Sequence, residues 1–422
     1  MNKNVIYEDG YLKRNPSVLP KGKIEIKNYE GRQNILDDYF KKAIRGLYKE
    51  PKGAMKYPYL VPGGEYQDLW DWDSFFVACA VPNEGIPYAK GSVQNILEGI
   101  IETTGRPPKK ISPSGERDSY SFPYPLQAQF AYIIGKRTGD FKWIEPYWNS
   151  LKRMRRWFDE NTKSERGFYL WLAMYGNGID NNPSVYGRPN HSSAGIDLAC
   201  WHYRDIMALY QLSKIFEPDL TTLYLNQAQE LKKQIQNCYW DTIDGYFYNI
   251  DCREDFAQKT CQEITWYTYL KFRNIASIFP LWAGIANGEQ AARIRDVLMD
   301  EKEFLSCCGT RSHSKIDPIY NNVMMVDPSN WQGPVWGLSS YLAAYGLSRY
   351  GYKDEAKLIV DRISDTFASD IRQNGCVHEY YDGDNGQPLF RPHFISWNIL
   401  GINAANDIEN GLDCTTLDLL DE

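Results

Sequence analysis

Apolar residues recur every three or four positions over most of this chain, which is the spacing of one buried face of an α-helix. Segments with this spacing are each about as long as one helix. They are 33–48, 92–104, 124–136, 143–160, 196–215, 223–238, 290–298, 337–350 and 353–368. The pattern therefore predicts an all-α protein.

Long loops rich in Gly, Pro, Asn and aromatic residues separate these helices, at 57–71, 104–125, 175–195, 306–332 and 373–392. Loops of this length are usually functional or disordered. Their content of Trp and Tyr favours ordered, functional loops.

No linker rich in Gly, Ser or Pro divides the chain, so we expect one domain over 1–422 with a short N-terminal extension at about 1–30. A double ring of antiparallel helices fits this pattern, and so does an α-solenoid. No fixed sequence repeat favours the solenoid.

Composition narrows the range of partners. The 422 residues are 43% hydrophobic, enough for a large core, and the net charge of -7 comes with no sustained basic stripe. A nucleic acid or an anionic membrane would need such a stripe, so neither is expected as a partner. The N-terminal sequence lacks the apolar run of a signal peptide, and no later stretch would span a bilayer, which together predict a cytoplasmic protein.

Cysteine and aromatic residues also bear on function. The nine cysteines lack the paired C-x-x-C spacing of a metal or redox site, so reduced and mostly buried thiols are expected. Aromatic residues make up 14% of the chain, with 13 Trp and 31 Tyr. Aromatic rings pack cores, but they also stack on the apolar faces of sugars, so the composition raises a carbohydrate hypothesis.

Two clusters of candidate site residues lie in the first half of the chain. In the cluster 62–76, Tyr66, Trp70, Trp72 and Asp73 follow two glycines, which suits aromatic platforms and a hydroxyl-binding carboxylate as well as a capped helix with core tryptophans. In the cluster 176–183, Asp180 sits between Gly, Asn and Pro residues and is by itself typical of a turn.

Two more clusters lie in the second half. The cluster 330–336 contains Trp331, Gln332, Gly333 and Trp336. Because Gly333 and Pro334 suit a shaped loop, we expect the two tryptophans to line a cavity and not to belong to the core. The last cluster places Glu379 beside tyrosines at 377–386, with Trp397 following. Its segment 382–386 resembles part of a calcium loop but lacks the twelfth-position Glu, so a turn is expected.

In this order the four clusters resemble the motifs of glycoside hydrolase family 63, most closely those of its short bacterial branch of mannosylglycerate and glucosylglycerate hydrolases. Residues 72–74 are similar to the family's sugar-binding W-D-S, and 178–181 to its general-acid G-[LM]-D-[DN]. Residues 331–336 resemble W-x-G-P-[IV]-W, the most specific of these motifs, and 378–381 resemble the general-base segment. The resemblance covers about 57–397.

The resemblance implies an (α/α)6 barrel whose loops gather all four clusters at one mouth. It also implies inverting hydrolysis of a small α-glucoside or α-mannoside, with Asp180 as general acid and Glu379 as general base, their carboxyl groups roughly 6.5–9.5 Å apart. The substrate-binding residues it implies are Tyr66, Trp70, Trp72, Asp73, Trp331, Gln332, Gly333, Trp336 and Trp397.

The chain also departs from the family pattern. Gly176 and Asn177 replace the Glu-Ser that often precedes the general acid, Ser184 stands where an Arg often follows it, and 122–125 replaces a Gln-Pro-Pro loop. Glycerate specificity is therefore not carried over. Basic residues could bind an acidic aglycone or serve the structure alone; they are Arg188, His191, Arg311 and Arg391.

Three other functions remain open. A trehalase shares the W-D-S cluster, but its glycine-rich run near the base is missing here. A sugar 2-epimerase would need paired histidines on helices, whereas the five histidines lie mostly in loops. A catalytically inactive sugar-binding protein would most simply have lost one carboxylate, and both remain.

Cofactor motifs offer no further candidate. Neither H-E-x-x-H nor a phosphate-binding G-x-x-x-x-G-K-[ST] occurs, and inverting hydrolysis needs no redox cofactor. We therefore expect no metal and no cofactor, and a small carbohydrate as the partner.

Overall fold

Helices of two kinds alternate along the chain in a computed structural model of the protein. The structure describes residues 6–8, 11–13, 18–100, 104–117, 122–172, 177–253, 268–325 and 328–422. Helices of the first kind bury one face, as the apolar spacing predicts. They are α1 (Arg32–Ala43), α3 (Ile86–Glu98), α5 (Trp148–Asn161), α7 (Thr221–Cys238), α10 (Gly288–Leu298) and α12 (Lys353–Asn374).

Helices of the second kind are buried on nearly every side. They are α2 (Asp71–Ala80), α4 (Gln127–Thr138), α6 (Ile196–Phe216), α9 (Phe279–Trp282), α11 (Gly337–Arg349) and the 3-10 helix η6 (Ser396–Ile402), which α13 (Ala404–Asn410) follows. Their near-complete burial indicates that they form the inner layer of the protein.

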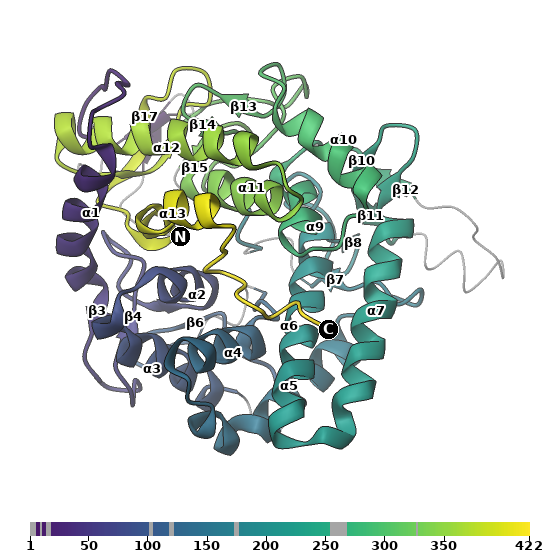
Figure 1. Cartoon of the computed structure of the whole chain (residues 1–422). Coiled ribbons are helices and arrows are strands. Elements are labelled where there is room, and N and C mark those ends of the chain that lie inside the picture. Colours follow the sequence, from purple (N-terminus) through teal and green to yellow (C-terminus); the bar gives the residue numbers. More distant parts are fainter. Residues whose placement is uncertain are drawn as a thin grey trace.

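The inner helices form a closed ring. Each contacts the next in the order α2, α4, α6, α9, α11 and η6, and η6 returns to α2. Around them α3 packs on α2 and α4, α7 on α6, α10 and α12 on α11, and α1 on α12. Figure 1 shows both layers, with α1, α3, α5, α7, α10 and α12 on the outside. The expected (α/α)6 barrel is therefore confirmed.

The segments that enter the inner helices meet at one end of the ring. Aromatic contacts join the start of α2 to the segment before α4 and to η6, through Trp72 with Tyr124 and Trp397. Trp72 also contacts Trp331, which lies shortly before α11. Residues far apart in the sequence thus come together at this end.

The C-terminal residues close the other end of the ring. They run across its centre in Figure 1, drawn in yellow. Thr415 accepts a hydrogen bond from Trp282 Nε1 at 2.8 Å, Arg204 Nη1 donates to Thr416 Oγ1 at 2.9 Å, and Leu419 is fully buried. These contacts lie at the end of the ring opposite the segments that enter the inner helices.

Short strands, absent from the all-α prediction, lie outside the helices. Paired strands are β1 (Ile6–Glu8) with β2 (Tyr11–Lys13), β3 (Tyr48–Lys49) with β4 (Tyr59–Leu60), β5 (Leu69–Trp70) with β6 (Lys110–Ile111), β9 (Trp240–Asp241) with β10 (Tyr246–Phe247), and β13 (Leu305–Ser306) with β14 (Gly309–Thr310). Larger sheets contain β7 (Leu170–Trp171), β8 (Ser193–Ala194), β11 (Asn249–Asp251) and β12 (Thr268–Leu270), or β15 (Val335–Trp336), β16 (His378–Tyr381) and β17 (Pro388–Pro392).

The remaining 3-10 helices are η1 (Ile44–Leu47), η2 (Asn83–Gly85), η3 (Lys142–Tyr147), η4 (Pro218–Leu220) and η5 (Ile275–Ile278). Part of the predicted N-terminal extension contacts the barrel: the amide of Lys27 donates to Ser369 on α12, and the amide of Lys21 to His378 on β16. None of the described helices is both long and apolar enough to cross a membrane.

Candidate active site

Glu379 lies on β16, the central strand of the sheet β15-β16-β17, and is only 4% exposed. The hydroxyl group of Tyr66 donates to its two carboxylate oxygens at 3.3 and 3.4 Å. Arg391 on β17 places Nε 3.8 Å from Oε2 and its guanidinium group 4.1 Å from the centre of the Tyr66 ring. Glu379 is thus held by one hydroxyl group and one cation.

Burial and the neighbouring charged groups shift the pKa of Glu379. Burial raises this pKa to about 8, the charges of Asp180 and Asp73 raise it as well, and Arg391 and Tyr66 oppose the rise. Carboxylates influence one another in this way only at short range. Asp180 and Asp73 thus lie near enough to Glu379 for their charges to affect its pKa, and their joint role in one site remains a prediction.

The loop that carries Asp180 is fixed by close packing. Gly178 has φ +80°, and a Cβ there would lie 2.3 Å from the Tyr124 hydroxyl oxygen and 2.9 Å from the Trp72 ring. The same hydroxyl group donates to the carbonyl of Asn177, while the amide of Ser329 donates to Asp180 Oδ2 at 3.3 Å. Only glycine fits at position 178.

Tyr124 is itself held in place by Asp71 and Lys109. Its amide donates to Asp71 Oδ2 at 2.9 Å, and Asp71 Oδ1 accepts from the amide of Trp72 at 2.7 Å. Lys109 is 3% exposed, with Nζ 3.4 Å from Asp71 Oδ1 and 4.0 Å from the centre of the Tyr124 ring. No sequence pattern pointed to Lys109, and Tyr124 was marked only by a departure from the family pattern.

Asn181 joins the Asp180 loop to the segment before α11. Its Oδ1 accepts from the amide of Trp331 at 2.7 Å, and its carbonyl accepts from Gln332 Nε2 at 2.9 Å. A Cβ on Gly333 would lie 2.2 Å from the carbonyl oxygen of Asn321, so this position also needs glycine. Gln332 and Gly333 therefore shape the loop, and their contact with substrate remains a prediction.

The tryptophans form a buried cluster next to these carboxylates. Trp331 and Trp336 stack with ring centres 4.0 Å apart, and Trp72 and Trp397 lie 6.2 and 6.3 Å from Trp331. Trp331 is 2% exposed and Trp336 is 1% exposed, and both belong to the hydrophobic core. The expectation that these two rings stay outside the core is wrong, because cross-strand pairing of β15 with β16 places Trp336 against Tyr380.

Asp73 and Trp70 differ in their surroundings. Asp73 Oδ1 accepts a hydrogen bond from Ser396 Oγ at 2.6 Å, and burial raises the pKa of Asp73 to about 6. Trp70 is half-buried on β5, and the Lys110 ammonium group lies 5.3 Å from the centre of its ring. No ring contact among the described residues connects Trp70 to the tryptophan cluster, so its role in binding remains a prediction.

The basic residues considered for binding an acidic aglycone do not all lie at the candidate site. Arg391 lies beside Glu379, whereas Arg188 Nη2 pairs with Asp251 at 2.8 Å. Arg311 Nη1 donates to three main-chain carbonyl groups, among them that of Leu305 at 2.7 Å. Of these three arginines, Arg391 alone contacts a predicted catalytic residue.

One group among the described residues brings ligand atoms within 4.8 Å of each other, namely Asp370, Cys376 and His378. His378 Nδ1 is 2.7 Å from Asp370 Oδ2, and His378 Nε2 accepts from the amide of Lys21 at 3.0 Å. Tyr381 also donates to Asp370, at 2.7 Å. Both imidazole nitrogens have protein partners, so this group supports the strand of Glu379 and has no free imidazole nitrogen for a metal.

Comparison with known proteins gives a family match. The family model described as "mannosylglycerate hydrolase MGH1-like glycoside hydrolase domain" matches residues 66–397. Mannosylglycerate hydrolase from Selaginella moellendorffii is 30% identical over 124 residues, which are 29% of this chain and 22% of that protein. Cytosolic neutral trehalase from Kluyveromyces lactis is 22% identical over 426 residues, covering 78% of this chain and 51% of the trehalase. The chain thus spans at most about half of these two relatives.

Solved structures share the fold. A family 63 mannosylglycerate hydrolase from Thermus thermophilus superposes with a TM-score of 0.63 at 18% identity, over 86% of this chain and 98% of that one. Neutral trehalase from Saccharomyces cerevisiae gives a TM-score of 0.60 at 18% identity, over 87% of this chain and 79% of that one. At this identity the likeness establishes the barrel architecture.

Proposed function

Because this chain belongs to the mannosylglycerate hydrolase MGH1-like glycoside hydrolase family, we propose that it hydrolyses the α-glycosidic bond of a small α-glucoside or α-mannoside with inversion. Asp180 is the general acid in this proposal, and Glu379 is the general base. The proposal is supported most strongly by the placement of Glu379, which is buried on β16, contacts Tyr66 and Arg391, and lies near enough to Asp180 and Asp73 for their charges to raise its pKa.

The two carboxyl groups have different tasks. A protonated Asp180 gives its proton to the departing glycosidic oxygen, while an ionised Glu379 accepts a proton from the attacking water. Inversion requires the two groups to flank the anomeric carbon roughly 6.5–9.5 Å apart, so that the water fits between Glu379 and the sugar. Asp180 lies in the segment before α6 and Glu379 on β16, so the two carboxyl groups come from separate parts of the chain.

Neighbouring groups support the role of Glu379. Arg391 favours its ionised form, and the Tyr66 hydroxyl group orients its carboxylate. With a pKa of about 8, Glu379 gains the ionised form of a base only as the pH rises toward that value. Activity is therefore expected to increase from pH 6 to pH 8.

A trehalase-like α-glucosidase is the second candidate. Trehalases match nearly four-fifths of this chain, more than the Selaginella hydrolase does. A screen of α-glucosides, α-mannosides, trehalose and glycosylglycerates, with detection of released sugar, separates the two candidates. Binding without turnover for every compound would instead identify an inactive sugar-binding protein.

The catalytic pair is tested by Asp180→Asn and Glu379→Gln. An amide is nearly isosteric with a carboxyl group but cannot transfer the proton, so both variants should fold and lose turnover. Glu289→Gln, an exposed position on α10, is the matched control and should retain activity. Wild-type rates in Asp180→Asn or Glu379→Gln would contradict the assignment.

Stereochemistry tests the mechanism separately. Proton NMR of the product, recorded before mutarotation, should show the β-anomer first from an α-linked substrate. A retaining enzyme holds its carboxylates only about 5–5.5 Å apart and passes through a covalent intermediate. Initial appearance of the α-anomer would exclude Glu379 as a base acting on water.

A further inference from the structure

Two adjacent cysteines occupy the turn of the β13-β14 hairpin. Ser306 pairs with Gly309 across the hairpin, which leaves Cys307 and Cys308 as the two turn residues. Both thiols are free; Cys307 is exposed and Cys308 is fully buried. One thiol is therefore open to solvent with a second directly beside it.

The surroundings of the turn favour a thiolate at Cys307. The Ser306 hydroxyl group lies 3.9 Å from the sulfur of Cys307 and 3.2 Å from that of Cys308. Arg362 donates to the carbonyl of Ser306 at 2.7 Å, which brings a guanidinium group to the base of the turn. The hydrogen bond from Cys308 and the charges of the nearby arginines lower the pKa of Cys307 to about 6, although burial opposes this shift.

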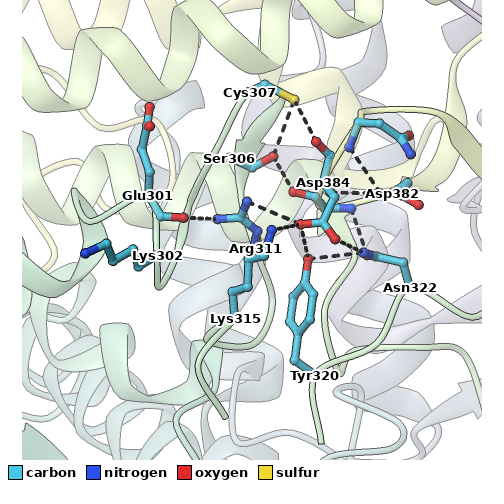
Figure 2. Close-up of polar contacts among 12 residues, drawn as sticks. Glu301, Lys302, Ser306, Cys307, Arg311, Lys315, Tyr320, Asn322, Asp382 and Asp384 are labelled. Carbon is cyan, nitrogen blue, oxygen red and sulfur yellow. Dashed lines mark hydrogen bonds and ion pairs between the residues drawn. The ribbon is translucent and has the colours of Figure 1, made fainter. Parts of the chain in front are cut away.

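The two thiols also hold the turn that follows the Glu379 strand. Cys307 Sγ is 3.7 Å from the carbonyl oxygen of Asp384, and Cys308 Sγ is 3.5 Å from that of Asp382. Figure 2 shows Cys307 next to Asp384, whose carboxylate accepts hydrogen bonds from Lys315 and Tyr320 at 2.6 and 3.1 Å. The hairpin turn is thus fixed against an ordered neighbour.

We propose that Cys307 and Cys308 form a reversible oxidation site for hydroperoxides, with Cys307 as the attacking thiol and Cys308 as the resolving thiol. The site is independent of the glycosidase chemistry. It rests on an exposed thiol in a hydrogen-bonded turn beside the guanidinium group of Arg362, and on a second thiol at the adjacent position of the same turn.

The reaction consumes one hydrogen peroxide. The thiolate sulfur of Cys307 attacks one peroxide oxygen, the O–O bond breaks, and the departing hydroxide takes a proton to become water, leaving a sulfenic acid. The Cys308 sulfur then attacks the Cys307 sulfur, the S–O bond breaks, and the departing hydroxide leaves as water with the Cys308 proton. The two thiols supply the two electrons that reduce the peroxide.

Rate measurements test the attacking thiol. At pH 6 about half of a thiol with a pKa near 6 is ionised, against roughly 0.3% of a reference thiol with a pKa near 8.5. The weaker nucleophilicity of a low-pKa thiolate offsets roughly tenfold of this advantage. Iodoacetamide should therefore alkylate Cys307 about tenfold faster than glutathione at pH 6, and an equal or slower rate would overturn the proposal.

Mass spectrometry tests the product. Trypsin cleavage after Lys302 and Arg311 isolates one peptide with both cysteines. After treatment of the intact protein with hydrogen peroxide and blocking of free thiols, this peptide should carry an internal disulfide that dithiothreitol removes.

Variants assign the two thiols. Cys308→Ser should stop at a sulfenic acid that dimedone captures, Cys307→Ser should form neither product, and Cys238→Ser on α7 should behave as wild type. Melting temperatures check that each variant is folded. Unchanged oxidation in Cys307→Ser, or a peptide that stays reduced in the wild type, would overturn the proposal.

Discussion

The guanidinium group of Arg391 lies beside the carboxylate of Glu379, with Nε 3.8 Å from Oε2. The pKa of Glu379 is raised to about 8, chiefly by burial, although this cation opposes the rise. Removing it in Arg391→Gln should raise the pKa further, and because a base acts in its ionised form, the acidic limb of kcat/KM should move about 1–3 pH units upward. Arg391→Lys keeps a cation and should give a profile nearer to wild type. An unchanged limb in Arg391→Gln would show that Arg391 does not tune Glu379.

Ionisation of Glu379 should lower the free energy of unfolding at high pH. The pKa of Glu379 is raised in the folded protein, so the folded state binds more protons than the unfolded state between about pH 4.5 and 8, and stability falls as pH rises through that range. Glu379→Gln removes this loss of stability. The shift of the Glu379 pKa from 4.5 to about 8 limits the loss to ~5 kcal/mol. Denaturant unfolding should therefore show Glu379→Gln gaining on wild type from about pH 5 to pH 9. Glu289→Gln should show no such gain, and a parallel response of both variants would contradict the prediction.

The sequence predicted several helices closely, including two that are buried on nearly every side. Segments 196–215, 290–298 and 337–350 end within two residues of α6, α10 and α11. The predicted 92–104 instead begins at Ile86 and ends at Glu98, because Pro87 suits the first helical turn.

Short buried helices were missed. No helix range was predicted for α2 or α9, which are 10 and 4 residues long and wholly buried, so neither shows a polar face or enough turns for the 3.6-residue period to stand out. The described strands are two to five residues long, too short for a period-two pattern to stand out.

The sequence motifs predicted the candidate catalytic residues, but not most of the residues that hold them in place. Asp180 and Glu379 stand in short patterns of Gly, Asn and Tyr that the sequence displays directly. The positions of Lys109 and Arg391 next to the site depend on contacts with Asp71, Tyr124 and Tyr66, which lie far from them in the sequence. The positive φ of 33° at Arg391 likewise has no signal in the sequence.

Trp336 should behave as a core residue. Its ring lies between Trp331 and Tyr380, with centres 4.0 and 4.6 Å away, and its Nε1 donates to the carbonyl of Asn330 at 3.0 Å. Trp336→Ala should lower the free energy of unfolding by ~3–5 kcal/mol, as expected for a buried tryptophan. Trp240→Ala, at a half-buried ring on the β9-β10 hairpin, should cost less. Full stability with lost activity in Trp336→Ala would instead place this ring in the cavity wall.

Tyr124 should position the general acid without touching the reacting atoms. Its hydroxyl group donates to the carbonyl of Asn177, and its ring packs against Gly178, two residues before Asp180. Tyr124→Phe removes one buried hydrogen bond, worth about 1 kcal/mol, and leaves the ring in place. We therefore expect roughly a five- to tenfold lower kcat for a substrate whose leaving group needs protonation. An activated aryl α-glycoside of the same sugar leaves without a proton, so its kcat should stay near the wild-type value.

The matched control for this prediction is Tyr132→Phe on α4, because the Tyr132 hydroxyl group also makes a hydrogen bond, to Asp418 at 2.9 Å, but at the closed end of the barrel. It should change neither rate. Asp180→Asn should show the same dependence on the leaving group as Tyr124→Phe, with a larger amplitude, because it removes the proton itself and not its alignment. Equal losses on both substrates in Tyr124→Phe would mean that the hydroxyl group only stabilises the loop. Such a result, together with a strong dependence on the leaving group in Asp180→Asn, would leave the general acid in place and reject only its positioning by Tyr124.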